Sequence, residues 1–319
     1  MNLLFLAAGL GSRLKPITEK YPKPCVPFLN VPLGLYQLRF LQPHKNSRCV
    51  VNTFYLPEKV HSLFDTQSYY SQQFQFSDEK DQILGSAGGL KRASLLFDMN
   101  EPILMMNADE IYFPADKNFI DKALARHLSN KNMATLITMK HPEAGKKFGA
   151  IWCENNRVMD IGKSTTQTQL QPRHYIGMII LHPKVLTLIP ENTESNIFYD
   201  ILINQLKNES IESFNIETTW FETGNPEDYL AATQATLKNL QPETLQFINH
   251  HDPSRLIQNQ NGCSLVSNSI KIDESRLHGY NVISRSTNPE TLQSLGRIED
   301  SILFESEILN ESYFTASSR

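Results

Sequence analysis

A glycine turn near the N-terminus is followed by two basic residues that could bind a polyphosphate. Gly9 and Gly11 come after a short apolar run, and Arg13 and Lys23 follow them. Glycines let backbone N–H groups approach phosphate oxygens, an arginine offers paired hydrogen bonds, and a lysine supplies a point charge. Prolines on both sides of Lys23 hold that segment extended, which lowers the entropy lost in presenting its ammonium group. The pattern predicts a site for a nucleoside triphosphate.

Two common phosphate-binding motifs do not fit this turn. The nicotinamide dinucleotide fingerprint G-x-G-x-x-G requires glycine at the position held by Leu14, and no Gly-Lys-Ser/Thr follows at the spacing of a P-loop. No acidic residue ends a convincing second strand either, as a dinucleotide site would require. These departures argue against a Rossmann dehydrogenase and a P-loop enzyme.

The elements that must position these residues alternate between strands and helices. Short apolar runs predict strands at residues 3–7, 49–53, 103–107, 134–139 and 178–181. Helical patterns cover residues 33–41, 57–64, 88–97 and 119–129. This alternation predicts an α/β fold with a Rossmann-like, mainly parallel sheet flanked by helices. Because ligands bind beyond the carboxyl ends of such strands, the residues after Ala7 and Asn107 are the first candidates for chemistry.

The C-terminal part of the chain has a different pattern. Asn225 and Pro226 predict a helix start, and that helix is expected to end near residue 239. The polar residues 240–261 are expected to form a linker. In residues 262–319, apolar residues recur six apart, as at Leu277 and Ile283, which favours a short left-handed β-helix over an irregular β meander.

The composition and charge of the chain argue against some classes of binding partner. The chain has 319 residues, enough for about two domains, and a formal net charge of −4 without a basic block. No apolar run reaches the ~18 residues needed to span a bilayer. We therefore expect no nucleic-acid and no membrane partner. The four cysteines match no disulfide or metal-ligand spacing, so free thiols and a cytoplasmic location are expected.

Residues 6–33, LAAGLGSRLKPITEKYPKPCVPFLNVPL, closely resemble the opening of the sugar-phosphate nucleotidyltransferases. Their signature is G-x-G-x-R, then P-x-T, P-K-P and a later proline, and every position is matched. Further segments resemble the family in its order: residues 83–91, 107–109, 147–150, 175–177 and 220–226. The resemblance extends to about residue 237, looks most like the mannose-1-phosphate guanylyltransferase branch, and makes residues 1–239 the expected catalytic domain.

The resemblance implies an enzyme that joins a nucleoside triphosphate to a sugar 1-phosphate and releases pyrophosphate. Arg13 would bind the β- and γ-phosphates and Lys23 would face the α-phosphate, with Asp109 as the third catalytic residue. The implied nucleotide-binding residues are Leu6, Ala8, Gly9, Gly11, Ser12 and Gly88. The implied sugar-binding residues are Gly149, Lys163 and Gly177, and the implied Mg²⁺ ligands are Asp109 and Glu222. The position of Asp109 after a predicted strand fits a metal ligand.

Two residues depart from the family pattern. Ala108 stands where glycine is common, and Glu222 stands where the family has its second metal-binding aspartate. The extra methylene of Glu222 moves its carboxylate by roughly one C–C bond, and Mg²⁺ tolerates poor geometry badly. The leading prediction is an enzyme of the GDP-mannose type. The alternatives are a uridylyltransferase for an amino-sugar 1-phosphate such as N-acetylmuramate 1-phosphate, and a catalytically weak regulatory protein that binds nucleotide sugars. The chain could also associate with copies of itself as a homo-oligomer.

Overall fold

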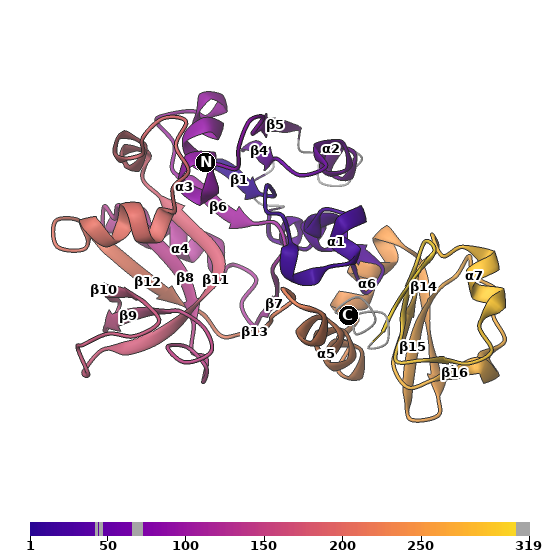
Figure 1. Ribbon diagram of the computed structural model, residues 1–319. Helices are drawn as coiled ribbons and strands as arrows, with labels where there is room; N and C mark the ends of the chain where they lie inside the picture. The colour runs from indigo at the N-terminus through magenta and orange to yellow at the C-terminus, as the bar shows by residue number, and fades with distance from the viewer. Residues whose placement is uncertain (42–43, 45–46, 66–72, 311–319) are drawn as a thin grey trace. The chain divides into compact units, whose positions relative to one another are not determined.

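The computed structural model describes residues 1–41, 44, 47–65 and 73–310. The chain folds into two compact units (Figure 1). Unit 1 consists of Met1–Leu10 and Gln37–Trp220, and unit 2 consists of Gly11–Tyr36 and Phe221–Arg319. The glycine turn is therefore divided, because Gly9 belongs to unit 1 and Gly11 to unit 2.

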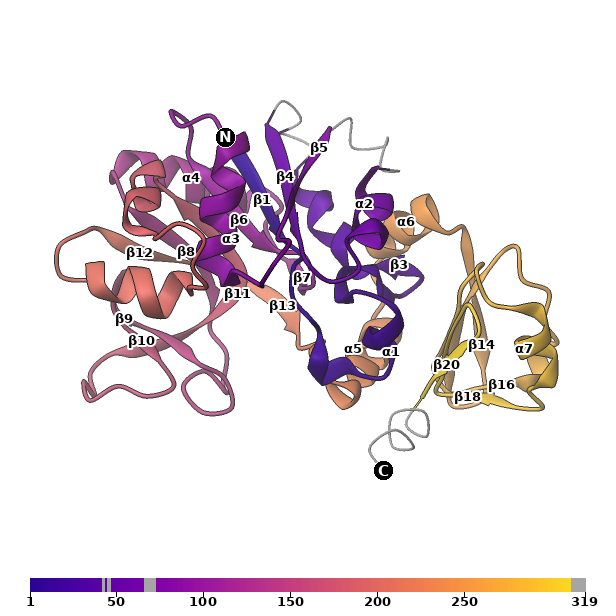
Figure 2. The same cartoon turned by 45° about the horizontal axis from the view of Figure 1, so that its top comes forward.

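Unit 1 is built on a nine-stranded sheet with the order β5-β4-β1-β6-β11-β8-β12-β10-β9 (Figures 1 and 2). The strands are β1 (Asn2–Leu6), β4 (Arg48–Thr53), β5 (Phe74–Asp78), β6 (Ile103–Asn107), β8 (Ala134–Met139), β9 (Ala150–Glu154), β10 (Arg157–Gly162), β11 (Gln171–Leu181) and β12 (Ile211–Asn215). A separate two-stranded sheet pairs β7 (Ile111–Pro114) with β13 (Thr218–Phe221).

The α/β class is confirmed, but the expectation of a mainly parallel sheet is wrong, because the sheet is mixed. Strands β5, β4, β1 and β6 are parallel, whereas β11 runs antiparallel to β6, β8 and β9. Strands β9 and β10 form a hairpin whose turn has Asn155 at φ 53°. Such a short connection can join only antiparallel strands. The apolar pattern revealed only the last four residues of β11 and missed this hairpin.

Helices cover both faces of the sheet at β1. Leu4 packs in one core with Ala87 and Leu90 of α3 (Gly85–Ala93). Phe5 points to the other face, where its ring lies 5.5 Å from that of Phe64 in α2 (Pro57–Asp65). This double cover explains why β1 is apolar at consecutive positions. The other helical segments of unit 1 are α4 (Phe119–Ser129), η6 (Ser94–Leu96), η7 (Pro183–Leu188), η8 (Ile197–Ile201) and η9 (Leu202–Gln205); η3 (Leu33–Phe40) begins in unit 2 and ends in unit 1.

Unit 2 combines short helices with small sheets. Its helical segments are η1 (Ser12–Leu14), α1 (Ile17–Lys20), η2 (Lys23–Cys25), α5 (Pro226–Lys238), α6 (Pro242–His251), η10 (Glu274–Arg276) and α7 (Pro289–Ser294). The predicted helix start is confirmed, because Asn225 Oδ1 accepts a hydrogen bond from the Asp228 N–H at 3.0 Å. Residues 240–261 are not an irregular linker: they form α6 and β14, and Ile248 is fully buried.

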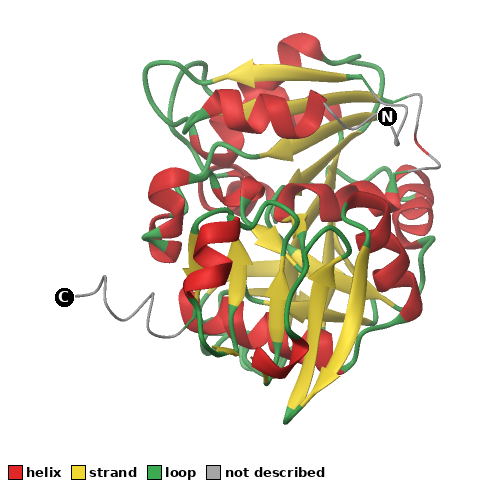
Figure 3. Ribbon diagram, turned by 90° about the vertical axis from the view of Figure 1, so that its right-hand side faces the viewer, coloured by secondary structure: helices red, strands yellow, loops and turns green. Residues whose placement is uncertain are grey.

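The C-terminal strands form a five-stranded sheet in the order β14-β15-β17-β19-β20, which faces the viewer in Figure 3. They are β14 (Ser254–Asn259), β15 (Gly262–Ser267), β17 (Asn281–Ile283), β19 (Ile302–Phe304) and β20 (Glu307–Leu309). β16 (Leu277–His278) pairs with β18 (Ile298–Glu299), and β2 (Pro27–Phe28) pairs with β3 (Val31–Pro32). The pairs β15/β17, β17/β19 and β16/β18 are parallel, whereas the outer pairs β14/β15 and β19/β20 are antiparallel. The left-handed β-helix stays a prediction, and residues 311–319 of its expected range lie outside the described residues.

In the part of the chain that the structure describes, no helix has both the length and the apolar character needed to cross a bilayer.

Candidate active site

The carboxyl ends of three parallel strands meet at one edge of the unit 1 sheet. Leu6 pairs with Asn52 of β4 and with Asn107 of β6. Beyond the strands, the Ala108 N–H donates to the Leu6 carbonyl at 3.0 Å. The predicted nucleotide-binding residues Leu6, Ala8 and Gly9 therefore leave the sheet beside the loop that carries Asp109.

Two buried polar residues that the sequence analysis missed hold this edge together. Asn52 Oδ1 accepts a hydrogen bond from the Ala7 N–H at 2.8 Å, and Asn52 Nδ2 donates to Glu79 Oε1 at 2.7 Å. Glu79 Oε2 accepts from the Leu84 N–H at 2.6 Å. Burial raises the pKa of Glu79. This network connects the loop after β1, which contains Gly9, to the loop before α3, the helix that contains Gly88.

Two of the predicted ligand-binding glycines are required by the fold itself. A β-carbon on Gly88 would lie 2.5 Å from the Thr193 carbonyl oxygen, because α3 packs closely there. Gly177 has φ +84°, and a β-carbon on it would lie 2.5 Å from Glu110 Cγ. Neither contact is possible for a larger residue without movement of the backbone or of the half-buried Glu110 side chain. These two glycines are explained without a ligand.

Gly9 and Gly149, unlike Gly88 and Gly177, have room for a larger side chain. A β-carbon on Gly9 would have no atom of a described residue within 4 Å, and one on Gly149 would meet only Tyr199 Oη at 3.7 Å. Neither glycine has the positive φ that alanine disfavours. Folding therefore gives no reason for glycine at these positions, which is expected where a ligand approaches the backbone closely.

We expect Gly9→Ala to leave thermal stability unchanged or slightly raised and to increase KM for the nucleoside triphosphate roughly tenfold, since each 1.4 kcal/mol of lost binding is a factor of ten. Gly296→Ala is a matched control, because a β-carbon there also meets nothing within 4 Å and the residue lies in the C-terminal sheet region. An unchanged KM in Gly9→Ala would contradict the role given to this loop.

Asp109 is followed by a carboxylate that the sequence analysis did not select. Glu110 Oε1 accepts a hydrogen bond from Asn107 Nδ2 at 3.2 Å, and its Oε2 accepts from Trp220 Nε1 at 2.8 Å. Glu110 thus joins the end of β6 to strand β13. Its neighbour in sequence, Asp109, is placed by the same short turn.

An aromatic cluster surrounds Trp220 next to the predicted sugar-binding residues. The rings of His141, Phe148 and His174 lie 4.2–5.8 Å from the Trp220 ring. Gly149 follows Phe148 directly, and Gly177 follows His174 by three residues. Lys163 is exposed at the end of β10. Because Gly162 pairs with Ala150, Lys163 and Gly149 leave the β9–β10 hairpin at the same end.

His174 is buried without a polar partner. The side chain is 7% exposed, and neither ring nitrogen has a hydrogen-bond partner among the residues that the structure describes. Burial and, to a smaller extent, the nearby His141 lower the pKa of His174 to about 4. The unfolded chain therefore takes up this proton at a higher pH than the folded chain, which destabilises the fold in acid.

We expect the free energy of unfolding to fall by about 2 kcal/mol between pH 7.5 and pH 5 through His174 alone, from a pKa of about 6.5 in the unfolded chain. His174→Phe keeps an aromatic ring in the cluster and removes the titrating group, so this part of the loss should disappear. Denaturant unfolding at the two pH values measures the difference. An equal loss in both proteins would refute the assignment.

In unit 2, the second glycine of the turn lies against the stem of Lys23. Gly11 has φ +62° and precedes η1, which contains Ser12 and Arg13. A β-carbon on Gly11 would lie 2.9 Å from Thr18 Cγ2 and 3.3 Å from Lys23 Cβ. Thr18 Oγ1 also donates to the Gly11 carbonyl at 2.9 Å. The turn is therefore packed against the stem of Lys23.

Glu222 and Arg13 both lie close to Gly224. The Gly224 N–H donates to Glu222 Oε1 at 2.6 Å. A β-carbon on Gly224 would clash with that oxygen and would lie 2.8 Å from Arg13 Nη2. Unit 2 thus brings together Arg13, Lys23 and Glu222 with the backbone of Gly11 and Ser12, although Glu222 is more than 200 positions from the turn. Asp109 and the predicted sugar-binding residues belong to unit 1.

Comparisons with known proteins show which family this chain resembles. A family model described as Nucleotidyl transferase matches residues 3–239. Mannose-1-phosphate guanyltransferase 2 of Candida glabrata is 31% identical over 284 residues, which are 85% of this chain and 71% of the relative. The mannose-1-phosphate guanyltransferase of Saccharomyces cerevisiae is also 31% identical, over 77% of this chain and 68% of the relative.

Solved structures share the fold. A UDP-glucose pyrophosphorylase complexed with UDP-glucose has a TM-score of 0.61 at 22% identity and covers 75% of this chain and 98% of its own. HddC from Yersinia pseudotuberculosis complexed with GMP-PN has a TM-score of 0.58 at 21% identity, covering 73% and 98%. The family model spans most of the chain and the yeast relatives exceed 30% identity. This chain therefore belongs to the nucleotidyl transferase family.

Proposed function

We propose that the protein transfers GMP from GTP to mannose 1-phosphate, giving GDP-mannose and pyrophosphate. The observation that carries the proposal is the grouping of Arg13, Lys23 and Glu222 in unit 2 of a chain that matches the nucleotidyl transferase family over residues 3–239. The names of the yeast relatives supply the base and the sugar. The Synechocystis relative, 27% identical, is named as a UTP–glucose-1-phosphate uridylyltransferase, so UTP is the first competing nucleotide.

In the proposed reaction, an oxygen of the sugar phosphate attacks the α-phosphorus of the triphosphate and pyrophosphate leaves from the opposite side. Little covalent help is needed, so the protein contributes position and charge. The guanidinium of Arg13 holds the β- and γ-phosphates, and the ammonium of Lys23 neutralises charge that develops on the α-phosphate. Backbone N–H groups at Gly11 and Ser12 add donors that need no reorganisation during the reaction.

The residues present suit a Mg²⁺ ion held jointly with the substrates. Among the residues that the structure describes, no group of three or more His, Cys, Asp and Glu could form a metal cage by itself. Mg²⁺ is commonly held by one or two carboxylates plus substrate phosphates. The carboxylates proposed from the family resemblance are Asp109 of unit 1 and Glu222 of unit 2. Within unit 2, one oxygen of Glu222 is already hydrogen-bonded to Gly224. When bound, the ion neutralises phosphate charge.

The proposed role of Glu222 can be tested by replacing it with aspartate, the residue that is usual in the family. An aspartate at 222 can still accept the Gly224 N–H, since a side-chain oxygen bonding the N–H two residues on is the common Asx turn. We expect Glu222→Asp to keep turnover with Mg²⁺ within about threefold of the original or to raise it, in line with about 0.65 kcal/mol or less. Turnover in the presence of Mg²⁺ and of Mn²⁺ measures the effect. An inactive protein before and after the change would favour the regulatory alternative.

For the C-terminal part we propose a short left-handed β-helix within residues 262–310 that supports homo-oligomer formation. The parallel pairs β15/β17 and β17/β19 and the stacked buried residues Val266, Ile283 and Leu303 favour it. Light scattering of the full chain tests the assembly, and a monomer at all concentrations would contradict it.

Three of the four thiols are buried, which fits a reducing compartment such as the cytoplasm.

Pyrophosphate release tests the reaction. GTP, UTP, dTTP, CTP and ATP are each incubated with Mg²⁺ and with mannose, glucose or N-acetylmuramate 1-phosphate. Release that depends on both GTP and mannose 1-phosphate is expected. Release with UTP and the amino-sugar phosphate would replace the proposed pair. Nucleotide binding without release in any combination would support the regulatory reading.

A further inference from the structure

The last hairpin of the chain contacts the segment that leads to Lys23. Tyr21 Oη donates a hydrogen bond to Glu305 Oε2, and Lys20 Nζ donates to Glu307 Oε1. The ring of Tyr21 also packs edge-on against Phe304, with centroids 5.1 Å apart. Tyr21 and Glu307 are 9% and 8% exposed, whereas their partners Glu305 and Lys20 are exposed, so each hydrogen bond has one buried end. All of these residues belong to unit 2.

The hairpin side of this contact is firmly anchored. Leu303 and Leu309 are fully buried, and β19 pairs with both β17 and β20. Glu305 occupies the tip of the hairpin with φ +55°, a conformation that non-glycine residues adopt only when their surroundings hold it. The Glu305 carbonyl accepts a hydrogen bond from the Asn288 N–H at 2.6 Å.

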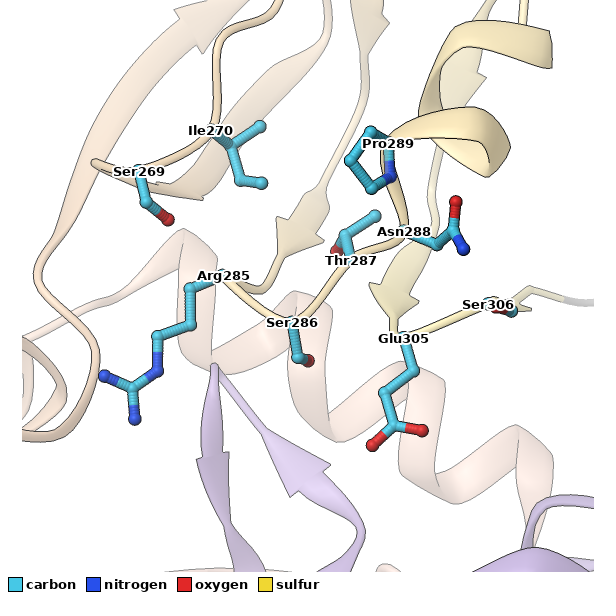
Figure 4. Close-up of a pocket in the computed structure, with 9 residues that line it drawn as sticks. All are labelled: Ser269, Ile270, Arg285, Ser286, Thr287, Asn288, Pro289, Glu305 and Ser306. Atoms are coloured by element: carbon cyan, nitrogen blue, oxygen red, sulfur yellow. The ribbon is translucent and has the colours of Figure 1, made fainter.

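A pocket of about 540 Å³ is lined in part by the same tip, through Glu305 and Ser306 (Figure 4). Arg285, Ser286 and Ser306 line it, and the carboxylate of Glu305 extends away from Asn288 and Pro289 in that view. The pocket lining is mostly exposed, and Glu305 is exposed as well, whereas Tyr21 is buried. Of these features, only the contact with Tyr21 reaches the segment that leads to Lys23.

The link from Tyr21 to Lys23 is short and stiff. Only Pro22 lies between them, with φ −60° and an extended ψ. Lys23 then begins a helical turn closed by hydrogen bonds from Cys25 to the Pro22 carbonyl at 2.8 Å and from Val26 to the Lys23 carbonyl at 3.1 Å. Because proline fixes φ and the helical turn fixes the backbone of Lys23, the position of the Tyr21 ring sets the direction in which the Lys23 side chain leaves the backbone.

We propose that the β19–β20 hairpin is a positioning element for the reaction: through Glu305 and Phe304 it fixes Tyr21 and thereby the ammonium of Lys23. The proposal rests on the role proposed for Lys23. A displacement of about 1 Å in a group that acts on the transition state can lower the rate by roughly two powers of ten. Loss of one anchoring hydrogen bond should therefore be visible in kcat.

The test uses the full chain and three substitutions. Tyr21→Phe keeps the ring contact with Phe304 and removes the hydroxyl, and Glu305→Ala removes the acceptor. Each is expected to lower kcat roughly tenfold, with KM for the triphosphate and the melting temperature nearly unchanged. Glu305→Gln keeps an acceptor oxygen and should restore most of kcat. The double variant Tyr21→Phe/Glu305→Ala should lose no more than either single variant, since both remove the same contact.

Tyr36→Phe is the matched control, because it removes a tyrosine hydrogen bond in the same unit, from Tyr36 Oη to the Phe28 carbonyl at 2.7 Å. Its kcat should stay near that of the original protein. Normal kcat in Tyr21→Phe and Glu305→Ala, with Lys23→Met inactive, would overturn the positioning role alone. Normal kcat in Lys23→Met would instead overturn the role of Lys23 itself.

Discussion

Lys23→Met is expected to lower kcat by about 10²–10³-fold while KM for the triphosphate changes little. Removal of one preorganised donor from the place where charge develops in the transition state has a cost of this size, about 2.7–4 kcal/mol. Methionine keeps the length of the side chain, so the packing of its stem against Gly11 should survive. A loss confined to kcat would identify an interaction made mainly in the transition state.

Lys122→Met is the control for this loss of charge. Lys122 is exposed and pairs with Asp116 at 2.6 Å in unit 1. An exposed ion pair contributes little, so stability should change by less than about 1 kcal/mol and turnover should be unaffected. A rise in KM without a fall in kcat for Lys23→Met would mean that Lys23 binds substrate and transition state equally.

Asp109→Asn is expected to reduce turnover by about 10³-fold and to raise the Mg²⁺ concentration required for half-maximal rate. Mg²⁺ is a hard cation that favours carboxylate oxygen, and an amide offers one neutral oxygen in its place. Asp109 directly precedes Glu110, whose hydrogen bonds to Asn107 and Trp220 do not involve the Asp109 side chain. The turn should therefore keep its shape in the variant.

Titration of the rate with Mg²⁺ measures this effect, and Asp116→Asn is the matched control at an exposed aspartate of the same unit. The control should need no additional Mg²⁺. An unchanged Mg²⁺ dependence in Asp109→Asn, whatever its rate, would remove Asp109 from the metal site.

The sequence predicted the central strands β6 and β8 more reliably than strands β9, β10 and β11. β6 and β8 were predicted with their observed bounds, because each is a buried run between polar residues. The β9–β10 hairpin was missed because its strands are half-exposed and mix apolar with polar residues. The direction of β11 depends on that hairpin, so the mixed character of the sheet was missed as well.

The residues proposed to bind the ligand could be selected from the sequence pattern, whereas the residues that hold the site's loops in place could not. Arg13 and Lys23 follow a glycine turn at a recognisable spacing. Glu79 and Glu110 instead act through hydrogen bonds to Asn52 and Trp220, which only the folded chain brings within reach. The one available signal was position, since Asn52 and Asn107 both end apolar runs at the predicted carboxyl edge of the sheet.

The fate of the phosphate oxygens tests the central claim most directly. Mannose 1-phosphate labelled with ¹⁸O in its phosphate oxygens is incubated with GTP, Mg²⁺ and the protein, and the products are read by phosphorus NMR and mass spectrometry. Attack on the α-phosphorus predicts that all label remains in GDP-mannose and that pyrophosphate is unlabelled. Label in pyrophosphate, or GDP and inorganic phosphate as the products, would contradict nucleotidyl transfer to the sugar phosphate.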